Sequence, residues 1–143
     1  MSLPKKLVLD ANILLRAVFG TRVNSILESY EDSAQFCTPD VYVEDARRHI
    51  LEIAASRRVP PADSQSVLDK LAGKFLYVVD RSFYDEFEEP ARARISARDI
   101  SDWPVVATAL LLNSPIWTED KDFLGSGVAT WTTRTIELYL RDA

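Results

Sequence analysis

The chain has 143 residues, 47% of them hydrophobic and 27% charged, which suits one globular domain with a full core and excludes a disordered chain. Its net charge of −5 excludes nucleic-acid binding by overall charge alone, so such binding would need local basic patches or bridging metal ions. A single cysteine, Cys37, excludes a disulfide framework and a cysteine-based zinc site.

Apolar runs and helix-breaking residues divide the chain into alternating strands and helices. KKLVLD is expected to form a buried strand because its apolar residues do not alternate with polar ones. Thr38 followed by Pro39 predicts a helix start, with a hydroxyl cap and proline at the first helical position. The expected elements are a strand at 5–10, helices at 11–19 and 21–30, a strand at 34–39, helices at 39–56 and 60–73, a strand at 74–80, a polar helix at 82–98 interrupted by Pro90, a buried helix at 102–113 capped by Ser101 or Asp102, strands at 115–120 and 127–133, and a helix at 133–142.

Strands separated by helices imply parallel pairing through right-handed crossovers. We therefore predict one domain over residues 1–143, a three-layer α/β/α sandwich around a mostly parallel sheet of four to five strands. In such open sheets, ligands bind at the carboxyl ends of the strands. No apolar stretch is long enough to span a bilayer and the N-terminus does not resemble a signal peptide, so we expect a cytoplasmic protein without a membrane partner.

Acidic residues recur near the expected carboxyl ends of the strands. Each has an ordinary explanation when taken alone: a helix cap, a turn residue, or an ion pair of Glu44 with Arg48 at helical spacing. Together they predict an acidic pocket, in which each pair about 5 Å apart would cost roughly 3 kcal/mol at an effective dielectric near 20. A bound cation would offset that repulsion, and oxygen-only ligands favour Mg²⁺ or Mn²⁺. The acids are Asp10, Glu44, Asp102, Asp120 and Asp122.

Three motifs resemble those of PIN-domain nucleases, in particular small VapC-like toxin ribonucleases. LVLDANILL is similar to the family's opening motif, an apolar strand followed by Asp-x-Asn. DWPVVATAL resembles the central motif, and IWTEDKDF resembles the closing motif, Thr-x-Asp-x-x-Phe. The resemblance covers about residues 6–133 and implies a PIN-like fold and a metal-dependent ribonuclease.

The resemblance also implies roles for individual residues. Asp10, Glu44, Asp102 and Asp120 would be the catalytic, metal-binding acids, with Asp122 as a further contact. Asn12 and Thr118 would orient these acids or the attacking water. Two alternatives stay open, since Asp99 could take the role of Asp102 and Asp45 lies beside Glu44. The candidates for phosphate contact are Lys121, Arg48 and Arg98.

The chemistry that these residues predict is hydrolysis of RNA by water. Carboxylate-bound ions neutralise the phosphate charge and activate the attacking water. His49 is the only histidine, which excludes a mechanism that uses two histidines as acid and base. The implied partners are the RNA substrate, an antitoxin encoded beside the toxin, and a second copy of the chain. The alternative function is a non-catalytic PIN-fold module for binding or assembly in an RNA-processing complex.

Overall fold

The computed structural model describes residues 4–95 and 100–141 of the chain, apart from the side chain of Asp122. Its centre is a five-stranded sheet in the order β3-β2-β1-β4-β5, in which every pairing is parallel. The central strand β1 pairs with β2 on one side and β4 on the other. The strands are β1 (Lys5–Leu9), β2 (Ala34–Pro39), β3 (Leu76–Val79), β4 (Ile116–Trp117) and β5 (Thr130–Trp131). The predicted parallel sheet of four to five strands is confirmed.

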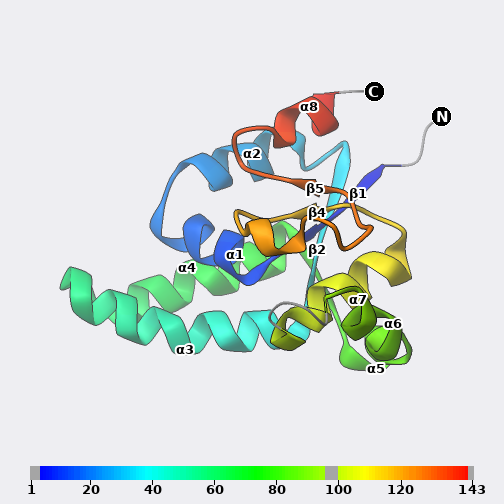
Figure 1. Ribbon diagram of the computed structural model, residues 1–143. Helices are drawn as coiled ribbons and strands as arrows, with labels where there is room; N and C mark the ends of the chain where they lie inside the picture. The colour runs from blue at the N-terminus through cyan, green and yellow to red at the C-terminus, as the bar shows by residue number, and fades with distance from the viewer. Residues whose placement is uncertain (1–3, 96–99, 142–143) are drawn as a thin grey trace.

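Helices cover the sheet and complete the three-layer α/β/α sandwich (Figure 1). α7 packs on β1, β2 and β4 and carries α5 and α6, whereas α1 contacts α2, α3 and α4. Figure 1 shows α5, α6 and α7 together at the lower right, while α1, α2 and α4 lie to the left. The helices are α1 (Ala11–Phe19), α2 (Arg22–Tyr30), α3 (Asp40–Arg57), α4 (Pro61–Lys74), α5 (Arg81–Tyr84), α6 (Glu88–Arg94), α7 (Trp103–Leu112) and α8 (Ile136–Arg141), with 3₁₀ turns η1 (Asp85–Phe87), η2 (Ile100–Asp102) and η3 (Lys121–Phe123).

The core explains why the apolar runs lack alternation. Leu7, Val8 and Leu9 of β1 are all fully buried, because helices cover both faces of a parallel sheet. α7 is buried over its first seven residues, Trp103 to Ala109. Burial of one such large apolar side chain stabilises the fold by about 1.5–3 kcal/mol. The carboxyl ends of β1 and β4 and the start of α7 are therefore fixed by the densest part of the molecule.

The predicted helix start at Thr38 and Pro39 is wrong. β2 continues through Pro39, and α3 begins at Asp40. The Thr38 side chain is fully buried, and its hydroxyl donates to the carbonyl oxygen of Leu9 at 3.1 Å. A buried hydroxyl needs a partner, and here the neighbouring strand supplies one, so Thr38 joins β2 to β1 instead of capping α3.

Other element boundaries also differ from the expected ones. The polar helix predicted at 82–98 is broken into α5, η1 and α6, and its last residues lie outside the described ranges. Pro90 lies in the first turn of α6, where its missing N–H has no intrahelical partner to lose. β5 and α8 are shorter than predicted, and Asp102 precedes α7 without a capping hydrogen bond from its side chain. Within the described residues, no helix has both the length and the hydropathy needed to cross a bilayer.

Candidate active site

Asp10 lies at the end of β1 and caps α1. Only 5% of the residue is exposed. Its carboxylate accepts hydrogen bonds from the backbone N–H of Ala11 at 2.8 Å, the Asn12 amide at 3.0 Å and the Thr118 hydroxyl at 2.7 Å. All three donors are neutral, so among the described residues this buried carboxylate is oriented by hydrogen bonds without being matched by a positive charge.

Burial is the largest influence on Asp10 and raises its pKa. The hydrogen bonds from Thr118, Ala11 and Asn12 lower the pKa, whereas the nearby carboxylate of Asp120 raises it further. The balance leaves the pKa of Asp10 above its ordinary value. The ionised form of Asp10 is thus disfavoured in the protein alone, and a cation beside it would restore that form.

Thr118 joins the closing motif to the opening motif. It follows β4, and its buried hydroxyl donates to Asp10 while accepting from the backbone N–H of Asp120 at 2.9 Å. Asn12 also reaches across, since its side-chain oxygen accepts from the Glu119 N–H at 3.5 Å. The structure therefore brings Asp10, Asn12, Thr118 and Asp120 together, as expected from parallel strands that end at one edge of a sheet.

Tyr42 connects these residues to α3 and α7. This buried tyrosine donates from its hydroxyl to the Asp102 carbonyl oxygen at 3.5 Å. Burial raises the pKa of Tyr42 most, and the carboxylates of Asp10, Asp102 and Asp45 raise it further. Sequence reasoning missed Tyr42; the available signal was an aromatic residue three positions before an acid, on the same face of the helix.

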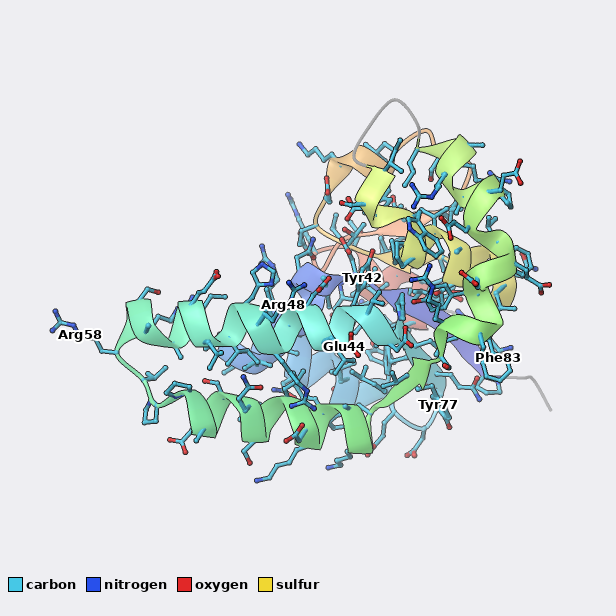
Figure 2. The ribbon with its side chains drawn as sticks, turned by 90° about the horizontal axis from the view of Figure 1, so that it is seen from below. Tyr42, Glu44, Arg48, Arg58, Tyr77 and Phe83 are labelled. Atoms are coloured by element: carbon cyan, nitrogen blue, oxygen red, sulfur yellow. The ribbon has the colours of Figure 1, made fainter. Side chains whose placement is uncertain are left out.

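The two adjacent acids of α3 point to different sides of the helix. Tyr42 and Asp45 are three residues apart and share one face, whereas Glu44, two residues after Tyr42, projects from nearly the opposite side. Figure 2 shows Tyr42 and Glu44 at opposite edges of α3. On the Glu44 side, Arg47 forms an ion pair with Asp69 of α4. α3 therefore turns Asp45 toward the strand ends and leaves Glu44 exposed beside α4.

Arg48 and His49 surround Asp45. Arg48 forms its ion pair with Asp45, not with Glu44 as the helical spacing had suggested. His49 Nδ1 lies 2.8 Å from the Asp45 carbonyl oxygen, which leaves Nε2 for other contacts. The exposed Lys121 lies in η3, after Asp120. Three candidates, Asp99, Arg98 and the side chain of Asp122, lie outside the described part of the chain.

Trp103 anchors the start of α7 directly after Asp102. The indole is 7% exposed, and its centroid lies 5.7 Å from that of Tyr84. The guanidinium carbons of Arg81 and Arg92 each lie 5.5 Å from its ring. These packed and cation–π contacts hold the indole, and with it the backbone of Asp102. Trp103 and Trp117 are both buried in the core, where neither offers a face for base stacking.

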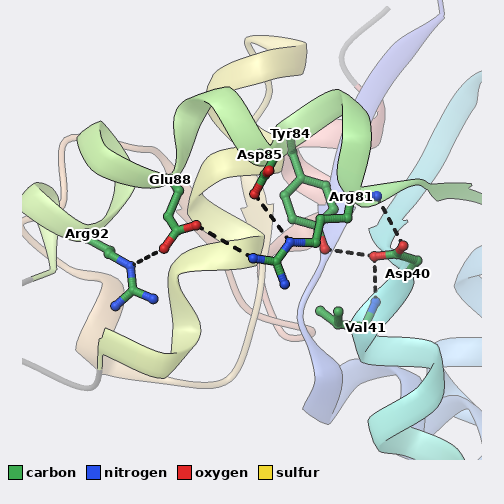
Figure 3. A network of polar contacts seen from close by, with 7 residues as sticks. All are labelled: Asp40, Val41, Arg81, Tyr84, Asp85, Glu88 and Arg92. Atoms are coloured by element: carbon green, nitrogen blue, oxygen red, sulfur yellow. Dashed lines mark hydrogen bonds and ion pairs between the residues drawn. The ribbon is translucent and has the colours of Figure 1, made fainter.

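A network of ion pairs and hydrogen bonds runs from Asp40 to Arg92 (Figure 3). The Tyr84 hydroxyl donates to Asp40 at 2.7 Å, and the backbone N–H of Arg81 donates to the same carboxylate at 3.0 Å. Arg81 pairs with Asp85 and Glu88, and Glu88 also pairs with Arg92. The network ties α5 and α6 to the beginning of α3, the helix that carries Asp45.

The donor chemistry of the site fits a hard divalent cation. The side chains around Tyr42 and Thr118 supply carboxylate oxygens, which Mg²⁺ and Mn²⁺ prefer. In the part of the chain that the structure describes, no three acidic, histidine or cysteine side chains are close enough to hold a metal ion. Cys37 takes no part, since it is buried and burial raises its pKa to about 11.

Residues 8–141 match the family model of the PIN domain. The chain belongs to the PIN domain family. Members of this family are generally nucleases that use divalent metal ions. No curated protein matches the chain in sequence. The matched residues contain all the acids described above, so the expected PIN resemblance is confirmed.

Solved structures with the same fold share little sequence with this PIN domain. The VapBC2 structure from Rickettsia felis, bound to a DNA fragment from its promoter, has a TM-score of 0.70 at 14% identity, covering 89% of this chain and 98% of that chain. A protein from Pyrobaculum aerophilum has a TM-score of 0.73 at 16% identity, covering 97% and 91%. FitAcB from Neisseria gonorrhoeae has a TM-score of 0.61 at 16% identity, covering 90% and 98%. At these identities the likeness shows the fold.

Proposed function

We propose that the chain is a metal-dependent endoribonuclease that hydrolyses phosphodiester bonds of RNA, and that residues 1–143 form one PIN domain. The observation that carries the proposal is Asp10, a buried carboxylate with a raised pKa that is oriented by Asn12 and Thr118. Perturbed carboxylates of this kind are concentrated at functional sites. A structural ion pair does not explain Asp10, because its hydrogen-bond donors are neutral.

Asp10, Asp102 and Asp120 would hold Mg²⁺ or Mn²⁺, with Asp122 as a further ligand. For the acid of α3 we propose Asp45 in place of Glu44, because Asp45 shares the Tyr42 face of the helix. When bound, the cation neutralises phosphate charge and activates the attacking water. Thr118 and Asn12 keep the Asp10 carboxylate aimed into the site, and Lys121 and Arg48 would contact the RNA phosphates.

Cleavage of RNA by the purified chain tests the proposal. The wild type should cleave single-stranded or structured RNA in Mg²⁺ or Mn²⁺ and leave 5′-phosphate ends, and EDTA should abolish the activity. Asp10→Asn should lower the rate by more than about 100-fold, above the range for residues that only support a metal ligand. Glu88→Gln is the matched control, because Glu88 is an acid paired with arginines away from the site.

The competing function is a non-catalytic PIN-fold module that binds or assembles in an RNA-processing complex. It is favoured by the lack of a preformed metal cluster among the described side chains. The same experiment decides between the two. If the wild type and Asp10→Asn are equally inert in both metals, the enzyme proposal fails and the binding module stands.

We also propose that the nuclease is a cytoplasmic toxin held in check by an antitoxin. Support comes from the similar folds of VapBC2 and FitAcB and of a toxin–antitoxin complex from Klebsiella pneumoniae. Expression of the chain alone should arrest growth, and co-expression of the adjacent reading frame should relieve the arrest. Light scattering would test the proposed homodimer. Arrest that persists in the Asp10→Asn variant would separate toxicity from catalysis.

A further inference from the structure

A pocket of about 390 Å³ lies between the carboxyl-terminal ends of α1 and α3. Arg16, Arg22 and Arg57 line it together with Leu15, Phe19 and Ile53, and no acidic residue is among its lining residues. This is unusual in a chain whose net charge is −5. The composition points to a ligand with both negative charge and an apolar surface.

Two of the three arginines are available to such a ligand. Arg22 is already paired with Glu137 at 2.9 Å. Within the described part of the chain, Arg16 and Arg57 have no acidic partner, and the Arg57 guanidinium carbon lies 5.2 Å from the centroid of the Phe19 ring. An arginine beside an aromatic ring can contact a phosphate while the ring or guanidinium plane stacks on a base.

Two helix faces run from the acidic site toward the pocket. On α3, residues 42, 45, 49 and 53 recur at helical spacing and lead from Tyr42 to Ile53 in the pocket wall. On α1, Asn12 and Phe19 are two turns apart on one face, and nine residues of helix span about 14 Å. A flexible chain that leaves the acids along these faces would reach the pocket.

A third wall ties the pocket to the closing motif. Thr133 lines the pocket, and its backbone N–H donates to the Glu119 carboxylate at 2.7 Å. Its hydroxyl accepts from the Trp117 indole N–H at 3.0 Å. Glu119 lies between Thr118 and Asp120, so the pocket wall is attached directly to residues of the proposed site.

We propose that this pocket binds a nucleotide of single-stranded RNA outside the scissile bond, with Arg16 and Arg57 on a phosphate and Phe19 beside a base. The inference rests on the proposed ribonuclease function. It adds a second contact, which extends the stretch of RNA that the protein binds. An acidic amphipathic peptide shares some of this chemistry. The helix faces that lead from the acids to the pocket favour RNA, because RNA is the ligand that must occupy both places at once.

The test is the anisotropy of a fluorescent, mixed-sequence RNA oligonucleotide in Ca²⁺, with the RNA confirmed intact by gel. Arg57→Gln and Arg16→Gln should each weaken binding about fivefold at 0.1 M salt and reduce the salt slope by about 0.7, the value for one lost phosphate contact on a single strand. Arg58→Gln is the matched control. Arg58 directly follows Arg57 as the cap of α3, and Figure 2 shows it at the helix tip, pointing away from the body.

A kinetic measurement supplies a second readout. Both variants should raise KM for a long RNA and leave cleavage of a dinucleotide unchanged, because a dinucleotide cannot span from the acids to the pocket. If the wild type binds and cleaves RNA but neither variant differs from Arg58→Gln, the pocket proposal is overturned and the ribonuclease proposal stands. A wild type that neither binds nor cleaves RNA overturns both.

A peptide titration tests whether the pocket binds a protein segment instead of RNA. A helical peptide with leucines at positions i, i+3, i+4 and i+7 and glutamates at the other positions is titrated against the wild type and Arg57→Gln. Peptide binding that depends on Arg57, together with RNA binding that does not, would make the pocket a protein-docking site and refute the nucleotide assignment.

Discussion

Two groups of acidic side chains lie close to the start of α3 and are stabilised in opposite ways. Asp85 and Glu88 are partly exposed and meet Arg81 and Arg92 in a chain of ion pairs (Figure 3). Asp10 is buried, receives hydrogen bonds only from neutral groups among the residues that the structure describes, and is destabilised by Asp120. The first group is neutralised within the protein, whereas the second would be neutralised by something that binds.

The ion-paired acids support the fold, whereas Asp10 is placed to serve function. Exposed ion pairs contribute little to stability one by one, about 0–1 kcal/mol each, but this network also positions the indole of Trp103 beside Asp102. The Asp10 carboxylate, in contrast, costs free energy in the absence of a ligand. Substitutions in the network should therefore lower the stability of the fold. Substitution of Asp10 should lower activity and remove the repulsion between Asp10 and Asp120.

Among substitutions in and around the ion-pair network, removal of the Trp103 indole should have the largest effect on the stability of the fold. Trp103→Ala should destabilise the fold by about 3–5 kcal/mol, because it leaves a cavity and releases Tyr84, Arg81 and Arg92. Urea unfolding measures the change. The control is Trp131→Ala: this half-buried tryptophan stacks on Tyr139 and should cost clearly less. Equal losses would show that Trp103 is not a special anchor.

The two acids of α3 test the geometry of the site. Asp45→Asn should reduce RNA cleavage by roughly 10- to 100-fold, the range for residues that hold or support a metal, whereas Glu44→Gln should stay close to wild type. The prediction follows from the shared face of Tyr42 and Asp45. The reverse order of effects, measured as kcat/KM at fixed Mg²⁺, would restore Glu44 as the acid.

The hydrogen bond between Tyr84 and Asp40 should have a smaller effect. The Tyr84 hydroxyl is buried, its pKa is raised by burial and by Asp40, and it donates at 2.7 Å. Tyr84→Phe should destabilise the fold by about 1–2 kcal/mol, since Asp40 keeps its bonds from Val41 and Arg81. Thermal unfolding of Tyr84→Phe and of the exposed Phe83→Leu control measures it. An unchanged melting temperature would mean that the bond is replaced by water.

The fold could be predicted from sequence because its signals are local and repeated. Continuous apolar runs such as LVL and the apolar helix after Asp102 already indicate a parallel sheet covered on both faces. The convergence of Asp10 with Thr118 also follows from strand ends that meet at one edge. The error at Thr38 arose because its buried hydroxyl binds a neighbouring strand, which local capping rules do not include.

Which of the two adjacent acids of α3 faces the strand ends could not be predicted, because it depends on helix rotation. Glu44 and Asp45 are adjacent, and only the packing of Tyr42 against Asp102 and of Arg47 against α4 determines which one faces the strand ends. The arginine-lined pocket could not be predicted from the sequence either, since Arg16 and Arg57 come from different helices and are 41 positions apart. Such juxtapositions are properties of tertiary packing.

The pH dependence of stability should distinguish Asp10 from the paired acids. Because the native pKa of Asp10 is raised, its contribution to stability is fully present below about pH 3.9, the unfolded value, and is lost as the pH rises through the native pKa. In EDTA, the melting temperature of Asp10→Asn relative to wild type should therefore increase from pH 4 toward neutrality. Glu88→Gln should show no such increase, since its partners are arginines.

Metal should reverse this difference at neutral pH. A cation that binds only the native state at several times its Kd adds about 1 kcal/mol, so Mg²⁺ or Mn²⁺ should raise the melting temperature of the wild type. Asp10→Asn should lose most of that gain, and Glu88→Gln should keep it. A pH-independent gap between wild type and Asp10→Asn, or an equal response of both to metal, would contradict the view that Asp10 is the acid left for a bound cation.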